Sequence, residues 1–340
     1  MTESWMPSRP EEPLSAPGMA TADSQAVCVR AEATGGAFAG LHLLSLRVCG
    51  AVFRRMGMRG MQRCTWALAR YLFGTGNSAV LQMAAGARLK IRLGDGYWTR
   101  LLVRGYVYEP EIGWALVRVL RDPKVFFLDC GANIGYWSAV CSQFLEPGHI
   151  LAVEALPPNY TQLAENAKLN HDRFLAAWGA LWERDGENVV IVGHELRHAG
   201  SSIVDRRDKI GTAGYKEYNV STVTIDSLCE RYVSDPEAKI VIKLDVEGAE
   251  IGALHGARKL FSQRQALILY EDHGQDKECR VSDFVMGQLG AEVYFFSETG
   301  GFKRMRSLAD VRNVKVEADT GYNFVAFTPG SSFADLFSAS

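Results

Sequence analysis

A regular alternation of short apolar runs with amphipathic segments is the strongest constraint on the fold of this chain. The apolar runs include VFFLD from Val125, HILAVEA from His149, KIVIKLD from Lys239 and ALILYED from Ala266. Segments with apolar residues at helical spacing, such as GAEIGALHGARKLF, lie between them. Because parallel strands need crossover helices that cover both faces, the pattern predicts an α/β fold with a doubly wound, mostly parallel sheet. Ligands of such sheets bind beyond the carboxyl ends of the strands.

One strand of this series is ambiguous in the sequence. Both FLAAWGAL, from Phe174, and VVIVG, from Val189, are apolar enough to lie beside HILAVEA in the sheet. AEVYFF and YNFVAF come late in the chain, with a polar stretch between them. The order of these segments in the sheet therefore stays open from the sequence pattern alone.

The composition divides the chain into four parts. Residues 1–36 are rich in Pro, Ser, Ala and Gly and predict a disordered tail. Residues 37–87 predict a basic amphipathic helical extension. Residues 88–330 predict the α/β domain, which opens with a hairpin of RLKIRL and WTRLLV, and residues 331–340 predict a C-terminal tail.

The helical extension admits two interpretations. Apolar residues recur at helical spacing, arginines lie among them, and no Asp or Glu occurs from Ala33 to Gly94. The first interpretation is an N-terminal cap that packs on the α/β domain. The second is weak contact of residues 37–75 with a membrane surface or an acidic partner.

Three features of the composition exclude some classes of protein. They are the net charge, the cysteine content and the N-terminal residues. A formal net charge of −2 argues against a nucleic-acid partner, since such proteins need an excess of Lys and Arg. The chain has seven cysteines, no CxxC pair and no apolar signal segment at its start. These features predict reduced thiols and a cytoplasmic location. The longest apolar stretch, residues 37–53, contains His42 and Arg47 and is a poor membrane span.

The stretch VFFLDCGANIGYWS carries the first indication of a ligand. Asp129 lies at the predicted strand end, and Gly131 and Gly135 permit a tight turn before a helix. The dinucleotide fingerprint needs glycines at two further positions, where this chain has Asn133 and Tyr136. The loop therefore suits a nucleotide-like ligand without a diphosphate.

Glu154 is the second indication. It ends the next predicted strand, 23 residues beyond Gly131, where a carboxylate can accept hydrogen bonds from both hydroxyls of a ribose. An acid at Asp129 suits an amino group or a positive charge. S-adenosylmethionine has the ribose, the amino group and the sulfonium that these features require. The structural alternative makes Asp129 a helix cap and Glu154 a solvated strand end.

These stretches resemble the FkbM-type methyltransferases, a group of the class I S-adenosylmethionine-dependent enzymes. The resemblance lies in DCGANIGY, VEALPPN, TIDSL and IKLDVEGAE, within a span from about Tyr108 to Phe327. It implies a seven-stranded, Rossmann-like sheet with a late antiparallel strand, which YNFVAF could supply. It also implies a set of cofactor residues: Asp129, Gly131, Ala132, Asn133, Gly135, Glu154 on the ribose, Ala155, and Ala180 near the adenine.

The predicted acceptor side uses acids at two further strand ends. Asp245 follows KIVIKL, and Glu247 lies near the start of the next helix, where the structural alternative is a favourable interaction with the helix dipole. Glu271 and His273 end YEDH and resemble the family's residues at this strand end; they could bind an acceptor hydroxyl and take its proton. The structural alternative for His273 is a surface histidine in a loop.

The sequence thus predicts an S-adenosylmethionine-dependent methyltransferase that acts on a hydroxyl of a small-molecule acceptor. The resemblance points to natural-product biosynthesis or sugar acceptors. N-methylation of an amide or modified peptide, and membrane-associated methylation of a lipid-linked or glycan acceptor, are the alternatives. No metal site is predicted; the alternative is a Mg²⁺ site between Asp245 and Asp272. A nucleotide-binding fold that has lost its chemistry is the non-enzymatic alternative.

Overall fold

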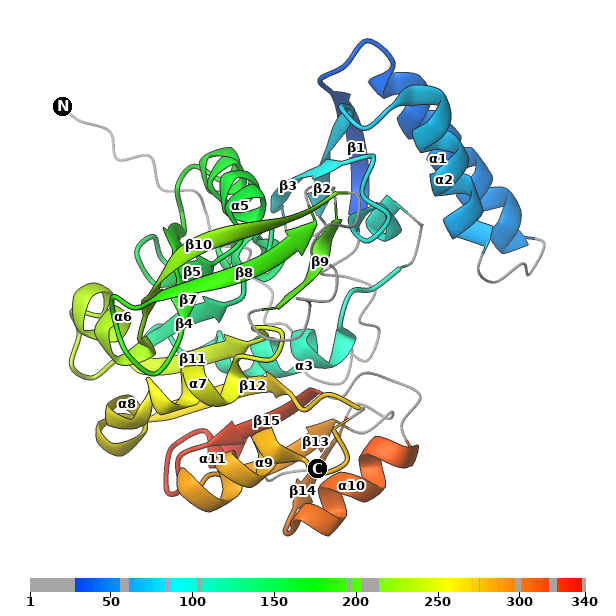
Figure 1. The fold of residues 1–340 in the computed structure, drawn as a ribbon. Coiled ribbons are helices and arrows are strands. Elements are labelled where there is room, and N and C mark those ends of the chain that lie inside the picture. The colour runs from blue at the N-terminus through cyan, green and yellow to red at the C-terminus, as the bar shows by residue number, and fades with distance from the viewer. Residues whose placement is uncertain are drawn as a thin grey trace, which may run out of the picture.

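The structure is a computed structural model that describes residues 28–55, 61–83, 86–102, 106–194, 197–202, 214–274, 276–296, 301–317 and 323–337. Its centre is an eight-stranded sheet with the order β14-β13-β15-β12-β11-β4-β5-β6 (Figure 1). The strands in this order are Phe302–Met305, Glu292–Phe296, Asn323–Phe327, Ala266–Glu271, Lys239–Leu244, Val125–Cys130, Ile150–Glu154 and Leu175–Trp178.

Strand direction confirms the predicted doubly wound sheet. The strands β6, β5, β4, β11 and β12 are parallel neighbours. The late strand β15 pairs antiparallel with both β12 and β13, as expected of YNFVAF. The sheet has one strand more than predicted, since β14 adds to the edge beside β13. The ambiguity at β5 is resolved because FLAAWGAL, and not VVIVG, supplies its neighbour.

Alternate side chains of the central strands enter two cores on opposite faces of the sheet. Val125 and Phe127 of β4 belong to one core and Phe126 and Leu128 to the other. The first face is covered by α3, α4 and α5, which span Pro110–Val119, Tyr136–Cys141 and Pro157–Leu169. The second is covered by α6 to α10, which span Ile225–Tyr232, Glu250–His255, Arg258–Gln263, Arg280–Asp283 and Leu308–Glu317, with the short π-helix Phe284–Gln288 after α9.

A second sheet of four strands lies beside the β5–β6 end of the molecule. Its order is β7-β10-β8-β9, with the strands Ala180–Leu181, Tyr215–Val223, Asn188–His194 and Arg197–Ser202. The run VVIVG therefore belongs to β8 of this sheet. β7 follows directly after β6, so its two residues lie close to the end of the main sheet.

A third sheet contradicts two predictions about the N-terminal region. β1, Cys28–Thr34, pairs with β2, Ser78–Met83, which pairs with β3, Arg88–Arg92. The disordered tail is therefore wrong for residues 28–34, while residues 1–27 lie outside the described part. Between β1 and β2 stand the helices α1, Ala39–Arg55, and α2, Met61–Phe73. The helical extension therefore ends before β2, inside its predicted range of 37–87.

The predicted hairpin after residue 88 is also wrong. β3 pairs with β2, and WTRLL forms a 3₁₀ helix, Trp98–Leu102, in place of a strand. The Asp95 carboxylate accepts the backbone N–H of Tyr97 at 2.7 Å, which turns the chain into this helix. Trp98 and Leu101 are buried there, so the segment packs into the core instead of returning along β3.

The last ten residues are not wholly a tail. Ala334–Phe337 forms the helix α11, while residues 338–340 lie outside the described part. Phe333 and Phe337 are buried in the first core, and Phe337 packs edge-on against Phe302. The predicted boundary at residue 331 thus divides a packed segment.

Candidate active site

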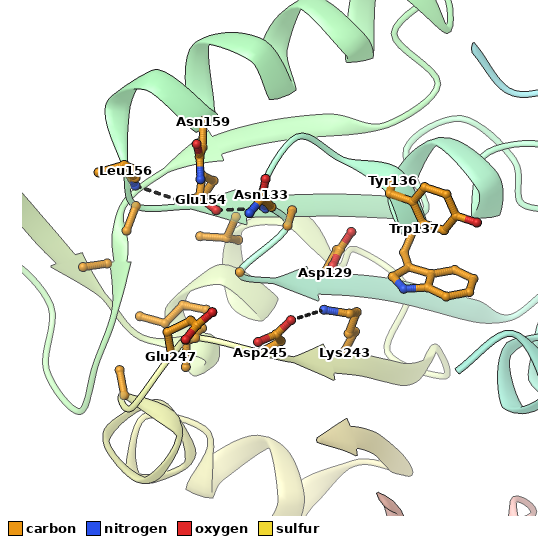
Figure 2. A pocket seen from close by; sticks show the side chains of 18 of the residues that line it. Asp129, Asn133, Tyr136, Trp137, Glu154, Leu156, Asn159, Lys243, Asp245 and Glu247 are labelled. Atoms are coloured by element: carbon orange, nitrogen blue, oxygen red, sulfur yellow. Dashed lines mark hydrogen bonds and ion pairs between the residues drawn. The ribbon is translucent and has the colours of Figure 1, made fainter. Parts of the chain in front are cut away.

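A pocket opens at the carboxyl ends of β4, β5 and β11, where a doubly wound sheet is expected to bind its ligand (Figure 2). Seven of the eight predicted cofactor residues line it: Asp129, Gly131, Ala132, Asn133, Glu154, Ala155 and Ala180. The predicted acceptor residues Asp245 and Glu247 line it too. The sheet order brings them together, because β4 lies between β5 and β11.

Asp129 is buried at the end of β4 and has one satisfied oxygen. Its Oδ2 accepts hydrogen bonds from the backbone N–H of Ser138 at 3.1 Å and from the Ser138 hydroxyl at 2.6 Å. Its Oδ1 is buried without a hydrogen-bond partner among the described residues. Burial raises the pKa of this carboxyl, and the nearby Lys243 ammonium opposes that rise. One carboxylate oxygen of this pocket-lining residue thus has no hydrogen-bond donor among the described residues.

Glu154 joins the end of β5 to the loop that follows β4. Its Oε2 accepts the N–H of Asn133 and its Oε1 accepts the N–H of Leu156, both at 2.8 Å. Burial raises the pKa of Glu154 to about 7, although these backbone hydrogen bonds favour the carboxylate. The carboxylate therefore fixes both loops at the mouth of the pocket.

Asn133 has a left-handed backbone with φ of 55°, which Asn tolerates better than most residues. This conformation accompanies the N–H bond to Glu154. Its side-chain Oδ1 accepts the indole N–H of Trp98 at 3.1 Å. The asparagine that replaces a glycine of the dinucleotide fingerprint thus connects the loop to a neighbouring aromatic side chain.

The two glycines of the loop serve packing within the protein. A Cβ at Gly131, where φ is 79°, would lie 1.8 Å from the backbone oxygen of Asp245. A Cβ at Gly135 would lie 2.6 Å from Leu163 of α5, and Gly135 does not line the pocket. Neighbouring protein atoms therefore leave no room for a side chain at either position.

Lys243 holds a positive charge among the acids of β4 and β11. It is 5% exposed, its Nζ lies 3.0 Å from Asp245 Oδ2, and it pairs in register with Asp129. Burial alone would lower the pKa of Lys243, but the carboxylates of Asp245 and Glu109 raise it. The ammonium therefore stays charged and holds Asp245 in place.

Glu271 and His273 lie further from the centre of the site. Neither belongs to the residues that line the described pocket, and His273 is exposed. Burial raises the pKa of Glu271 to about 8, and the negative charges of Asp245 and Glu247 add to the rise. Glu271 is therefore electrostatically linked to the site, whereas the surface alternative for His273 fits its exposure.

Asp272 does not face Asp245. It is fully buried, its Oδ1 lies 2.8 Å from the Lys315 ammonium, and its Oδ2 accepts the N–H of Ser282 at 3.0 Å. These contacts fix α9 and α10 to β12. The Mg²⁺ site weighed between Asp245 and Asp272 therefore lacks one of its two carboxylates.

An aromatic wall next to the acids was missed by the sequence analysis. It consists of Tyr97, Trp98, Tyr108, Tyr136 and Trp137, all of which line the pocket. The hydroxyls of Tyr97 and Tyr108 are 3.0 Å apart, and the Trp137 indole donates to Glu109 Oε2 at 2.8 Å. Tyr136 and Trp137 directly follow Gly135 and could have been found from the loop. The others precede it by at least 27 residues and had no such signal.

A family model for the methyltransferase FkbM domain matches residues 129–308. A comparison with curated proteins finds no match. The solved methyltransferase FkbM from Methylobacillus flagellatus is 15% identical with a TM-score of 0.37, over 63% of this chain and 47% of its own. This chain thus spans about half the length of that protein.

Two other solved structures have remote similarity to the chain. A putative RNA methyltransferase from Pyrococcus horikoshii is 10% identical with a TM-score of 0.30, over 66% of this chain and 82% of its own. Fibrillarin from Aeropyrum pernix, in complex with natively bound S-adenosyl-L-methionine, is 12% identical with a TM-score of 0.33, over 74% of this chain and 93% of its own.

Proposed function

Because the chain belongs to the FkbM family of methyltransferases, we propose that it transfers a methyl group from S-adenosylmethionine to a hydroxyl of a small-molecule acceptor. The observation that supports the cofactor best is the pair of acids, Asp129 and Glu154, at neighbouring strand ends of one pocket. Asp129 Oδ1, which is buried without a partner among the described residues, could accept a hydrogen bond from such a ligand. Natural products and sugars are the acceptor classes we favour.

The residues present fit S-adenosylmethionine. Its amino group would donate to Asp129 Oδ1. Its ribose would donate to Glu154, whose oxygens accept backbone N–H groups, including those of Asn133 and Leu156, and have acceptor capacity left. Ala155 and Ala180 line the same pocket, and their small side chains would leave room for the adenine. When bound, the cofactor supplies an electrophilic methyl group on a sulfonium.

The protein's own part in the reaction is to position the acceptor, exclude water and remove a proton. The acceptor would lie against the aromatic wall, with its hydroxyl near Asp245. Asp245 is held by Lys243 and would lie beside the reacting methyl group. Glu271, with a pKa of about 8, is a suitable base because this pKa is close to a working pH. This carboxylate would take the hydroxyl proton.

The cofactor site is tested by calorimetric titration of the purified chain with S-adenosylhomocysteine. We expect binding in the micromolar range and its loss in Glu154→Ala. The matched control is Glu183→Ala, a substitution of an exposed glutamate outside the pocket, which should bind like the wild type. Absence of binding by the folded wild-type chain, or equal binding by Glu154→Ala, would overturn the proposed cofactor site.

The acceptor is then sought by incubating the chain with candidate hydroxyl compounds and a donor that carries a labelled methyl group. A labelled product whose new methyl lies on oxygen supports the proposal. A product methylated on nitrogen would replace it with the N-methyltransferase alternative, and the cofactor site would stand unchanged.

A further inference from the structure

The helices α1 and α2 form a pair that stands out from the body of the molecule beyond β1–β3 (Figure 1). Their inner sides bury Ala39, Leu43 and Ala69, and α1 contacts β1, β2 and the helix Trp98–Leu102. The inner side of the helix pair therefore packs as expected of a cap on the next domain. Such packing does not account for the residues on the outer side.

Exposed apolar side chains concentrate on this helix pair. Of the thirteen large hydrophobic residues that are exposed in the described part of the chain, eight lie between Phe38 and Leu72. We use the term outer face for Leu41, Leu44, Val48 and Val52 of α1 with Leu68 and Leu72 of α2, which are 47% to 60% exposed. Exposed apolar side chains grouped on one helix pair in this way indicate an interaction surface.

The spacing of these residues makes each helix amphipathic. Leu41, Leu44, Val48 and Val52 follow one another at intervals of three and four residues, so they share one side of α1. The stripe runs for about 17 Å along the helix at 1.5 Å per residue. Leu68 and Leu72 are four residues apart on α2, and the 86%-exposed Tyr71 lies beside them.

The positive charge of α1 and α2 indicates which kind of partner would bind the outer face. No acid occurs from Ala33 to Gly94, whereas α1 contains Arg47, Arg54 and Arg55 and α2 contains Arg63 and Arg70. A second copy that docked through the same face would bring like charges together. An anionic lipid bilayer offers both an apolar interior and negative headgroups, which is what a basic amphipathic helix requires.

We propose that the outer face of α1 and α2 docks this protein on the surface of anionic membranes, with the apolar side chains in the headgroup boundary and the arginines on the lipid phosphates. Among the described residues, no helix is long and apolar enough to cross a membrane. The helix pair is also tied to the pocket. Trp66 of α2 packs on Gly96, directly before the wall residues Tyr97 and Trp98.

The test is cosedimentation of the full chain with phosphatidylcholine vesicles that contain or lack phosphatidylserine. We expect binding to the anionic vesicles at least about tenfold tighter than to the neutral ones, and weaker at 0.5 M than at 0.05 M salt because salt screens the arginines. The variant Leu44→Ser/Val48→Ser/Leu68→Ser should lose at least about tenfold of this affinity, since it removes three apolar anchors. Each replaced side chain is more than half exposed, so folding should survive.

The matched control is Phe144→Ser/Val190→Ser/Leu336→Ser, which removes the same number of exposed apolar side chains from elsewhere on the surface. It should bind vesicles like the wild type. Melting curves verify that each variant is folded, and Arg47→Glu gives a second, milder variant with reduced binding.

Two results would overturn the proposal. One is absence of vesicle binding by the folded wild type at low salt, and the other is equal binding by the outer-face variant. If the wild type instead sediments as a dimer that the outer-face variant dissolves, with no vesicle binding, then the face belongs to a second copy and not to lipid. None of these results depends on the methyltransferase activity.

Discussion

At the scale of single residues, the acids of the pocket differ in their hydrogen bonds and ion pairs because their surroundings differ. Asp129 keeps one oxygen without a partner in the described structure, Glu154 uses both oxygens on backbone N–H groups, and Asp245 is held by a buried lysine. Their type and order could be found from the sequence. Their division of roles follows from which donors the fold places beside each carboxylate.

Glu154 makes the stability of the chain depend on pH. Its pKa of about 7 in the folded state lies above the ordinary value near 4.5, so the proton is bound more tightly in the folded chain. The resulting stabilisation is present below the ordinary pKa and is lost as the pH rises through 7. We predict that the free energy of unfolding of Glu154→Gln, relative to wild type, increases by about 2–3 kcal/mol between pH 5 and pH 8.

Urea unfolding of both proteins at several pH values measures this difference. Other titrating groups affect wild type and variant alike and cancel in the comparison. A difference that stays constant with pH would show that Glu154 has an ordinary pKa in the folded chain.

At the scale of elements, the site depends on how closely the strand ends β4 and β11 approach. Gly131 follows β4, and its Cα faces the backbone oxygen of Asp245 after β11. We predict that Gly131→Ala lowers the free energy of unfolding at least twice as much as Gly148→Ala. Gly148 has a similar φ of 89° but no atom within 4 Å of an added Cβ, so it reports the backbone strain alone, about 1–2 kcal/mol.

Denaturant unfolding of the two variants provides the comparison, and calorimetric titration shows whether Gly131→Ala also weakens S-adenosylhomocysteine binding. Equal loss of stability in both variants would mean that the two loops can separate without cost. The contact between Gly131 and Asp245 would then not determine the shape of the pocket.

The ion pair between β12 and α10 is a second feature at this scale. Lys315 and Asp272 are 4% and 0% exposed at their side chains and 2.8 Å apart. Because removal of one partner leaves a buried charge, Lys315→Met should lower the free energy of unfolding by about 3–5 kcal/mol. The double variant Lys315→Met/Asp272→Leu should recover most of this loss.

Thermal and urea unfolding measure the stability of both variants. Titration with S-adenosylhomocysteine shows whether the ion pair also affects ligand binding. We expect the affinity of the folded double variant for S-adenosylhomocysteine to equal that of the wild type. A large loss of affinity would assign Asp272 to the ligand site instead of to the packing of α9 and α10.

At the scale of the whole molecule, three sheets contribute to one pocket. The main sheet supplies the acids, the short strand β7 of the second sheet supplies Ala180, and the segment after β3 of the third sheet supplies Tyr97 and Trp98. The same third sheet carries the helix pair with the outer face. The cytoplasmic location, the acceptor class and the lack of a nucleic-acid partner stay predictions.

The sequence by itself determined the central sheet, its direction and the acids at its edge. The periodicity of apolar residues indicates strands and helices. In a parallel sheet, acids at the carboxyl ends of the strands all lie at the same edge. β1, CVRAEAT, was missed although apolar and polar residues alternate in it, because two of its apolar residues are alanines, which are depleted in strands, and a stretch rich in Pro, Ser, Ala and Gly precedes it. β14 and α11 were missed because each has four residues, too few for a period to show.

Only the tertiary structure decided which groups meet in space. The aromatic wall joins residues from two segments that no local pattern links, and Asp272 turned away from Asp245 because a buried lysine lies on the other side of β12. At the two glycines of the loop, atoms from other segments of the protein leave no room for a side chain. Contacts between residues that are distant along the chain depend on how the elements pack. The spacing of residues within one element does not determine this packing.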